Sequence, residues 1–312
     1  MVTVDRHSDG NAAPRPKLSV GLAVYNGERY LEAAIGSILA QSFTDFELII
    51  CDNASTDSTG EICQRFSAAD PRVRYFRNAE NIGGANNENL TFSYARGDYF
   101  RWAADDDICL PTLFERCVGV LDDMDDVVLC YTRTVTIDAD GEPLDERFEQ
   151  RGTALGAAER FRELADRRHL CEATYGIIRS DVLRSTGLQR NYTDSDRVLL
   201  AALALRGRFV QLDEPLFLKR RHERNMFNDW RARMNWFEPG SRRRIRLPNW
   251  MAAGHLAYEA VRAPIALPER TRSLGWVLEW CWRQRRPLLG DVWYSLRSLI
   301  RRPTESWRFN WE

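Results

Sequence analysis

Two hydrophobic periods alternate along the first two thirds of the chain. Short apolar runs predict buried strands, and each is followed by a polar loop and then by apolar residues at helical spacing. The predicted strands cover residues 18–24, 46–51, 73–76, 98–102, 127–134, 174–179, 209–212 and 216–218. The predicted helices cover residues 28–41, 58–68, 85–95 and 198–205, with others starting at Pro111 and after residue 179, and residues 138–156 are predicted to be a polar loop.

Strands that alternate with helices predict an α/β fold with a mainly parallel, Rossmann-like sheet flanked by helices. In such sheets, ligands bind beyond the carboxyl ends of the strands. Three polar or acidic loops follow predicted strands, at residues 25–28, 52–57 and 105–107. Because these loops should meet at one edge of the sheet, we expect a binding site there.

The chain changes in character near its last third. Residues 1–200 carry 22 basic and 34 acidic side chains, whereas residues 201–312 carry 22 basic and 11 acidic ones. Nine of the ten Trp residues lie from Trp230 onward, and helices are predicted over 250–262, 270–285 and 289–301. We therefore divide the chain into a disordered lead-in (1–16), an α/β domain (17–224) and a helical C-terminal appendage (225–312).

The Arg- and Trp-rich appendage has three readings. Its amphipathic helices suit a membrane surface, where Trp lies at headgroup depth and Arg meets anionic lipid. Its apolar faces could instead pack on the α/β domain or on a second subunit, as in a homodimer. Nucleic acid is the least favoured partner because the sequence shows no recognised nucleic-acid-binding module, and none is expected.

The cysteines and the apolar runs bear on the compartment. The seven cysteines are odd in number and have no C-x-x-C spacing, which favours reduced thiols over a disulfide framework. The first residues lack the apolar core of a signal peptide. The longest apolar run, Val198–Leu205, is far shorter than the roughly 20 residues that span a bilayer. We expect a cytoplasmic protein, either soluble or peripheral on the inner face of the cell membrane.

Acidic side chains at two strand ends are candidates for chemistry. The carboxylates of Asp105, Asp106 and Asp107 repel one another unless a cation neutralises them, and oxygen ligands suit Mg²⁺ or Mn²⁺ bound to a diphosphate. The alternative is a solvated acidic turn. Asp52 directly follows a strand, where a carboxylate can accept hydrogen bonds from a base or a ribose. Its alternative role is in a helix-capping loop.

Three further positions have weaker signals. Asn81 and the following Gly83-Gly84 lie at the start of a predicted helix. The segment could bind an anion there, or it could be a plain turn. Asp194 and Asp196 precede a predicted helix. One of them could be a general base, or both could be charges that stabilise the start of the helix. His222 ends a basic segment. It could bind a metal or a phosphate, or it could be a plain surface residue. The sequence has neither a G-x-G-x-x-G nor a P-loop motif.

In this order, the segments resemble family-2 glycosyltransferases, which have the GT-A nucleotide-diphospho-sugar transferase fold. The resemblance covers roughly residues 18–222 and is closest in the first hundred. Its motifs are Val24-Tyr25-Asn26-Gly27-Glu28, the run from Phe46 through Asp52-Asn53-Ala54-Ser55-Thr56-Asp57, Asn81-Ile82-Gly83, Ala95-Arg96-Gly97-Asp98, the acidic triplet with Pro111, Thr193-Asp194-Ser195-Asp196, and Lys219-Arg220-Arg221-His222.

The resemblance implies a metal-dependent, inverting hexosyltransferase. The nucleotide sugar would be bound by Ala23, Tyr25, Asn26, Glu28, Asp52, Asn81, Gly84, Asp105 and Arg221. Mn²⁺ or Mg²⁺ would be held by Asp106, Asp107 and His222. Asp194 or Asp196 would be the catalytic base; Thr193 stands where the family has Glu, and Ala104 where it commonly has an acid.

The implied donor is a nucleoside-diphosphate sugar, and the implied acceptor is a saccharide or lipid-linked hydroxyl in bacterial cell-surface polysaccharide or glycolipid synthesis. A second class of function is a non-catalytic sugar-nucleotide-binding relative or a nucleotidyltransferase. The nucleotidyltransferase would need a Gly-rich basic loop after the first strand, where this chain has residues 25–28. The degenerate binder would be expected to lack the acidic triplet or the downstream acid, and both are present.

Overall fold

The computed structural model describes residues 15–147, 150–167, 169–222, 236–237, 239 and 245–300. The predicted lead-in, apart from its last two residues, and most of the segment between 223 and 244 lie outside these residues.

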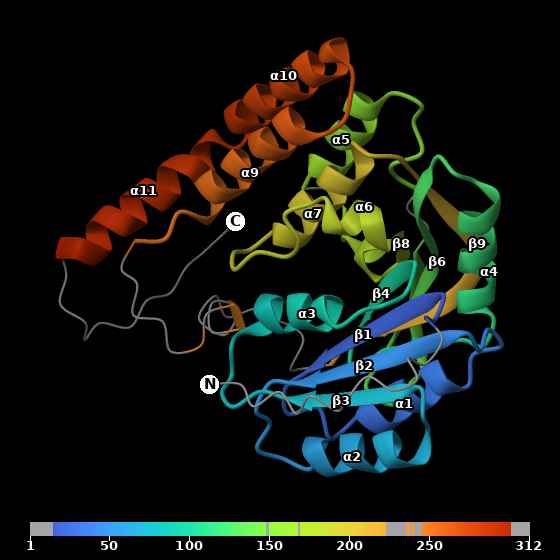
Figure 1. The fold of residues 1–312 in the computed structure, drawn as a ribbon. Coiled ribbons are helices and arrows are strands. Elements are labelled where there is room, and N and C mark those ends of the chain that lie inside the picture. The colour runs from blue at the N-terminus through green and yellow to red at the C-terminus, as the bar shows by residue number, and fades with distance from the viewer. Residues whose placement is uncertain are drawn as a thin grey trace.

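The first half of the chain contains four parallel strands with helices between them (Figure 1). These elements are β1 (Leu18–Val24), α1 (Leu31–Leu39), β2 (Phe46–Asp52), α2 (Thr59–Ala69), β3 (Val73–Arg77), α3 (Gly84–Ser93) and β4 (Tyr99–Ala103). They match the predicted alternation closely.

The second half completes the sheet and adds helices. Its elements are β5 (Ile108–Cys109), α4 (Leu113–Asp123), β6 (Val127–Ile137), β7 (Pro143–Arg147), α5 (Ala157–Ala165), the 3-10 helix η1 (Glu172–Tyr175), β8 (Ile177–Arg179), α6 (Ser180–Arg184), α7 (Ser195–Ala204), β9 (Arg208–Arg220), α9 (Pro248–Arg262), α10 (Leu267–Arg283) and α11 (Arg285–Ile300).

In the described residues, nine strands form one sheet in the order β3-β2-β1-β4-β8-β6-β9-β5, with β7 paired to β6. Strand β8 runs antiparallel to both its neighbours, β5 is antiparallel to β9, and β6 and β9 are parallel. The predicted α/β fold with a mainly parallel sheet is confirmed.

Both faces of the central strands are covered, which explains their unbroken apolar runs. Leu18, Val20 and Leu22 of β1 are fully buried in a cluster with α1 and α4. A second cluster contains Phe92 of α3 and Phe100 of β4, together with residues of α5 and α7. Figure 1 shows α1 and α2 below the sheet and α3 above it.

Two of the predicted boundaries are wrong where polar residues lie in a strand. The predicted loop 138–156 contains β7, which pairs with the far end of β6. The predicted strands 209–212 and 216–218 are one strand, β9. Its pairing with β6 shifts register between Thr132 and Thr134, so that the polar stretch around Pro215 is accommodated as an irregularity.

A third difference concerns residues 174–179, where only β8 is a strand and the first two residues belong to η1. Gly176 follows η1, and its N–H donates to the carbonyl of Ala173. This turn shortens the strand.

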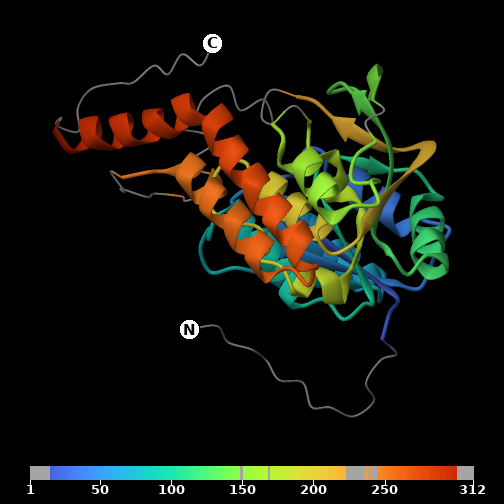
Figure 2. The ribbon, with the colours of Figure 1, turned by 90° about the horizontal axis from the view of Figure 1, so that it is seen from above.

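Helices α9 and α10 share a core with the α/β part of the molecule. Leu256 of α9 and Trp280 of α10 belong to the same buried cluster as Phe161 and Leu203. The Trp280 indole N–H donates to the carbonyl of Ala165 at 3.1 Å. Helix α10 packs on α5 and α9 packs on α7, while α11 extends beyond them (Figure 2).

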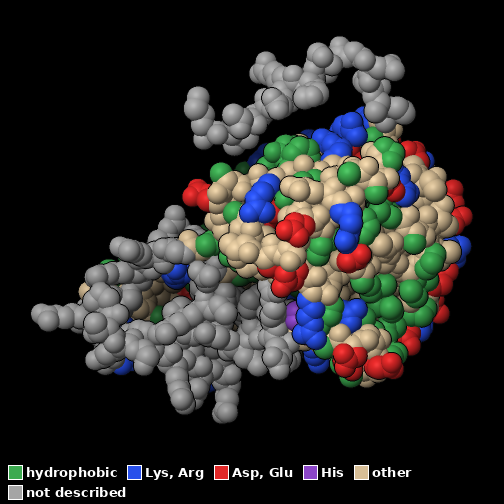
Figure 3. Space-filling model, turned by 90° about the horizontal axis from the view of Figure 1, so that it is seen from below, with side chains coloured by type: hydrophobic (Ala, Val, Ile, Leu, Met, Phe, Trp, Pro, Cys, Tyr) green, Lys and Arg blue, Asp and Glu red, His purple; other side chains and the backbone are tan. Residues whose placement is uncertain are grey.

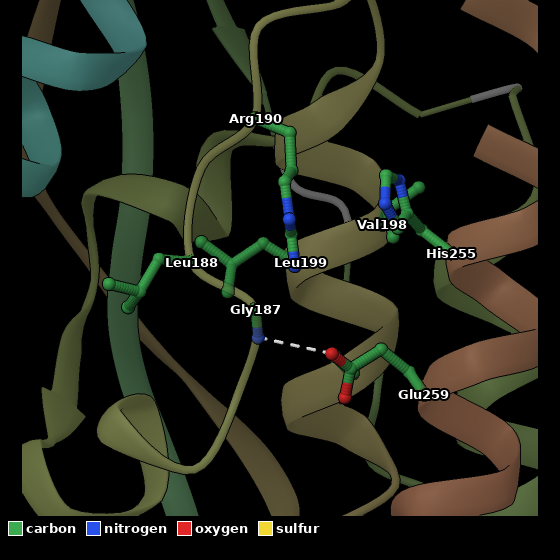
Figure 4. Close-up of a pocket in the computed structure, with 8 residues that line it drawn as sticks. Gly187, Leu188, Arg190, Val198, Leu199, His255 and Glu259 are labelled. Carbon is green, nitrogen blue, oxygen red and sulfur yellow. Dashed lines mark hydrogen bonds between the residues drawn. The ribbon is translucent and has the colours of Figure 1, made fainter. Parts of the chain in front are cut away.

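A small cavity marks where α9 meets α7 (Figure 4). Its volume is about 10 Å³, which is room for one water molecule. Glu259 accepts the Gly187 N–H at 3.0 Å and forms a buried ion pair with Arg206 at 2.9 Å. His255 contacts the Tyr192 hydroxyl at 2.9 Å. The contact between α7 and α9 is therefore closely packed, with polar side chains at its edge. Within the residues that the structure describes, no helix is long and apolar enough to span a membrane.

Candidate active site

The loops after β1 and β2 are joined by hydrogen bonds. Asn26 has a φ of 53°, and its N–H donates to Ser55 Oγ at 2.9 Å. Its Oδ1 accepts the Thr56 N–H at 2.7 Å. Glu28 Oε2 accepts the Ser58 N–H at 3.0 Å. Asn26 and Glu28, both predicted to bind nucleotide, thus fix the shape of the two loops.

Asp52 lies at the end of β2 and is fully buried. Its Oδ1 accepts the Ser55 N–H at 2.8 Å, and its Oδ2 accepts the Tyr75 hydroxyl at 2.9 Å. Arg77 forms an ion pair with the same oxygen at 2.5 Å. An open hollow of about 520 Å³ borders this site and is lined by Ser55, Thr56, Asp57, Gly60, Glu61, Gln64 and Arg77. Asp52 itself does not line the hollow, whereas Arg77, a residue that sequence analysis missed, both lines it and pairs with Asp52.

Asparagine side chains hold the turn that opens α3. Asn53 Oδ1 accepts the Ile82 N–H at 2.9 Å, and its Nδ2 donates to Asn81 Oδ1 at 2.8 Å. Asn81 Oδ1 also accepts the Gly83 N–H at 2.9 Å. Gly83 has a φ of 86°, and a Cβ on Gly84 would lie 2.2 Å from the Trp236 ring. The turn at Gly83-Gly84 is thus held by asparagine side chains, and the Trp236 ring lies against Gly84.

The acidic triplet meets the end of β9. His222 Nε2 lies 2.9 Å from Asp106 Oδ2, and the side chains are 9% and 16% exposed. Asp107 Oδ1 accepts the Arg220 N–H at 2.8 Å. The Arg220 guanidinium donates to the Asp106 carbonyl at 3.0 Å and lies 4.6 Å from the centre of the Tyr30 ring. The predicted approach of the basic segment to the triplet is therefore present.

The other two carboxylates of the triplet differ in their surroundings. Asp105 lies against the first loop, because its Oδ2 is only 2.2 Å from where a Cβ on Gly27 would be. Burial raises the pKa of Asp107 to about 8, and the negative charge of Asp106 adds to this. A cation would relieve both effects.

Asp194 and Asp196 lie at the start of α7, in different contacts. Asp194 has a φ of 70°, and its Oδ2 is 2.9 Å from Arg167. Its Oδ1 lies 3.8 Å from Arg197. Asp196 Oδ1 accepts the Arg197 N–H at 2.8 Å. Asp194 is thus held by basic side chains, whereas Asp196 bonds to the backbone of its own helix.

Tyr175 and Glu88 were missed by sequence analysis, because neither lies in a motif. Burial raises the pKa of Tyr175 well above its usual value, and the charges of Asp107, Glu88, Asp106 and Asp196 act in the same direction. Burial, followed by the charge of Asp196, raises the pKa of Glu88 to about 8. The charges of the triplet and of Asp196 therefore both act on Tyr175.

The remaining predicted residues lie at the edges of the site. Ala23 is half-buried near the end of β1, and Tyr25 is 44% exposed. Arg221 is exposed, and its N–H donates to the Ile137 carbonyl at 2.8 Å. A ligand that lies along the loops after β1 and β9 could therefore reach these side chains.

A divalent cation fits the triplet in part. Among the described residues, no three His, Cys, Asp or Glu side chains form a complete metal-binding group. Asp106 and His222 nevertheless face each other, and Mg²⁺ is commonly bound through one or two carboxylates, with substrate phosphates and water as the other ligands.

The model of glycosyl transferase family 2 matches residues 19–187, more than half of the chain, and the chain belongs to this family. EpsE of Bacillus subtilis is 40% identical over 108 residues, which are 34% of this chain and 39% of EpsE. The chain spans less than half the length of the curated relatives that it matches.

Solved structures share the fold at low sequence identity. TarS 1–349 of S. aureus superposes with a TM-score of 0.65 at 14% identity, over 90% of this chain and 80% of TarS 1–349. A mannosyltransferase from Pyrobaculum calidifontis gives a TM-score of 0.53 at 15% identity, over 92% and 74% of the two chains. The GT-A fold expected from the resemblance is confirmed.

Proposed function

We propose that the protein transfers a sugar from a nucleoside-diphosphate sugar to an acceptor hydroxyl, with inversion at the anomeric carbon. The observation that carries this proposal is the junction of the acidic triplet with Arg220 and His222. It joins carboxylates for a divalent cation to cationic groups for a diphosphate, at the carboxyl ends of parallel strands.

Known complexes of fold relatives support the class of donor. TarS has been crystallised with UDP-GlcNAc, and the Pyrobaculum calidifontis mannosyltransferase with GDP-Man and Mn²⁺. In this chain the nucleoside would lie along the loops after β1 and β2, near Tyr25 and Asp52. The Gly84 end of α3 and Arg221 would border the sugar diphosphate.

Asp106, Asp107 and His222 would hold Mn²⁺ or Mg²⁺. When bound, such an ion neutralises negative charge on the leaving diphosphate. Arg220 and Arg221 add fixed positive charge on the same side, which stabilises the charge that develops as the glycosidic bond breaks.

Asp194 would accept the proton of the attacking hydroxyl. Its carboxylate is 32% exposed and paired with Arg167, so an acceptor hydroxyl can reach it while Arg167 holds it in place. Asp196 is the alternative base, and its bond to the Arg197 N–H gives it a second role in shaping the start of α7.

The acceptor class follows from the location that we propose. We infer a saccharide or lipid-linked acceptor in bacterial cell-surface polysaccharide or glycolipid synthesis, reached by a cytoplasmic protein at the inner face of the membrane. The exposed apolar side chains of α10 and α11 support this location. Leu278, Trp282, Leu289, Trp293 and Leu296 are between 53% and 73% exposed.

Charge on this surface favours lipid over a second subunit. Residues 278–300 include four Arg and two acidic residues, of which Glu279 pairs with Arg283 and Asp291 is buried. A symmetric dimer through this surface would bring Arg against Arg, whereas anionic lipid would neutralise it. Co-sedimentation with phosphatidylcholine vesicles, with and without phosphatidylglycerol, tests this. Leu289→Glu should abolish binding to the anionic vesicles. If the wild-type protein does not bind vesicles but forms a dimer that Leu289→Glu dissociates, the surface is a subunit interface instead.

A thermal-shift screen tests the proposed function. Nucleoside diphosphates and nucleotide sugars should raise the melting temperature, and more so with Mn²⁺, because ligands that bind the folded state stabilise it. Asp106→Asn should melt as wild type does without ligand but lose the additional Mn²⁺ effect. If no nucleotide sugar shifts the wild-type protein, the proposal is wrong.

A further inference from the structure

Arg167 lies between the C-terminal helices and the loop that carries Asp194. Its guanidinium forms an ion pair with Asp194 Oδ2 at 2.9 Å and donates to Asn249 Oδ1 at 2.6 Å. It also donates to Gln284 Oε1 at 3.2 Å and lies 5.2 Å from the centre of the Trp280 ring. One side chain therefore contacts the start of α7 together with α9 and the end of α10.

The amide of Asn249 is itself held in place. Asp291 of α11 accepts the Asn249 backbone N–H at 2.8 Å and its Nδ2 at 2.7 Å. Both residues are buried, at 8% and 6% exposure. Because Nδ2 faces the carboxylate, Oδ1 faces Arg167 as an acceptor. The contacts thus run from α11 through α9 and Arg167 to Asp194.

Asp194 needs such support. Its φ of 70° lies in the left-handed region, which is costly for a residue with a side chain. Of the two basic side chains beside it, Arg167 is at 2.9 Å and Arg197 at 3.8 Å. The direction of the Asp194 carboxylate therefore depends mainly on Arg167.

We propose that Arg167 is a positioning residue, which helices α9–α11 hold in place and which in turn orients Asp194. The inference rests on the proposed function for the role of Asp194 as base. It gives the C-terminal helices a part in the reaction besides any contact with a membrane.

Amide hydrogen exchange tests the positioning without a substrate. In Arg167→Met, exchange over residues 190–197 should rise about tenfold. Arg162→Met is the matched control, since Arg162 lies 3.9 Å from the centre of the Trp276 ring at the same α5–α10 contact. Unchanged exchange over residues 190–197 in Arg167→Met would overturn the proposal, even if no nucleotide sugar binds.

A melting curve shows first whether Arg167→Met folds. If it does not, Asn249→Ala removes the side chain that joins Arg167 to Asp291 and should raise exchange over the same residues. If Asn249→Ala leaves that exchange unchanged, the proposal is wrong.

Turnover tests the link to the reaction. Arg167→Met should lower kcat about 10²-fold, the scale of a small misplacement, with the donor KM and the donor-induced thermal shift nearly unchanged. In an Asp194→Asn background the same substitution should have no further effect. Arg167→Lys should restore only part of the rate, because Lys lacks the planar fork that reaches several partners. Independent, multiplying effects of the two substitutions would contradict the proposal, and so would loss of the donor-induced shift in Arg167→Met. Absence of that shift in the wild-type protein would instead count against the proposed function.

Discussion

At the residue scale, contacts distinguish groups that look alike in the sequence. Asp105, Asp106 and Asp107 are adjacent, yet one lies on Gly27, one faces His222 and one bonds to the Arg220 backbone. Charge and burial at each position follow from these contacts. Substitutions of single acids should therefore have different consequences.

Asp194→Asn should reduce turnover by at least about 10²-fold, because it removes the general base. Asp196→Asn should reduce it less, because an amide oxygen can still accept the Arg197 N–H. Both variants should keep the wild-type melting temperature within a few degrees. Steady-state kinetics with a donor found by thermal shift measures the difference, and a larger loss in Asp196→Asn would reverse the assignment.

Glu88 should make stability depend on pH. Part of its side chain remains open to solvent, but protein surrounds the carboxyl, and burial raises its pKa to about 8 from 4.5. The folded state therefore keeps the proton that the unfolded chain releases, so stability should fall as the pH rises from about 4.5 to 8.

Glu88→Gln removes this titration. Its stability relative to wild type should be greater at pH 8 than at pH 5 by at least about 1 kcal/mol, since one pKa unit is worth about 1.4 kcal/mol. Urea unfolding at the two pH values provides the measurement, with Glu80→Gln in an exposed turn as control. An equal difference at both pH values would show that Glu88 is ionised in the folded protein.

At the scale of elements, the turn into α3 depends on backbone that only glycine adopts easily. Gly83 has a φ of 86°, and a Cβ there would lie 2.2 Å from the Phe237 carbonyl oxygen. The asparagines around it fix the turn through side-chain bonds to backbone N–H groups. Helix α3 therefore begins at a position set by loop chemistry rather than by its own amphipathic pattern.

Gly83→Ala should lower the free energy of unfolding by about 1–3 kcal/mol, from strain and the close contact. Gly119→Ala in α4 is the control, because nothing lies within 4 Å of its Cβ and Ala is the better helix former. It should gain about 0.5–1 kcal/mol. Chemical denaturation of both variants measures the change in the free energy of unfolding. Equal changes in the two variants would show that the turn at Gly83 has no special need for glycine.

At the scale of the whole molecule, the C-terminal helices and the α/β part share one core. Leu256 and Trp280 are buried against α5 and α7. Charges are also mixed at the surface, since basic and acidic side chains are interspersed over the face shown in Figure 3. The C-terminal helices and the α/β part are therefore joined by apolar packing, although the sequence gives its two parts opposite net charges.

Leu256→Ala should cost about 2–5 kcal/mol and leave a single unfolding transition, because its cavity would lie in the shared core. Leu278→Ala, at 73% exposure, should change stability by no more than about 0.5 kcal/mol. Calorimetry would show the outcome. Two separate transitions, with Leu256→Ala affecting only one, would mean that α9 folds independently.

The sequence by itself determined the alternation of strands and helices, the family and the loops that follow the parallel strands. Buried parallel strands need unbroken apolar runs, and ligand loops follow them directly, so this information is local. Only the tertiary structure decided which partners the acids have. Arg77 at Asp52 and Arg167 at Asp194 are 25 and 27 residues away along the chain. Such pairs form only when strand order and helix packing bring distant segments together, and no local pattern encodes them.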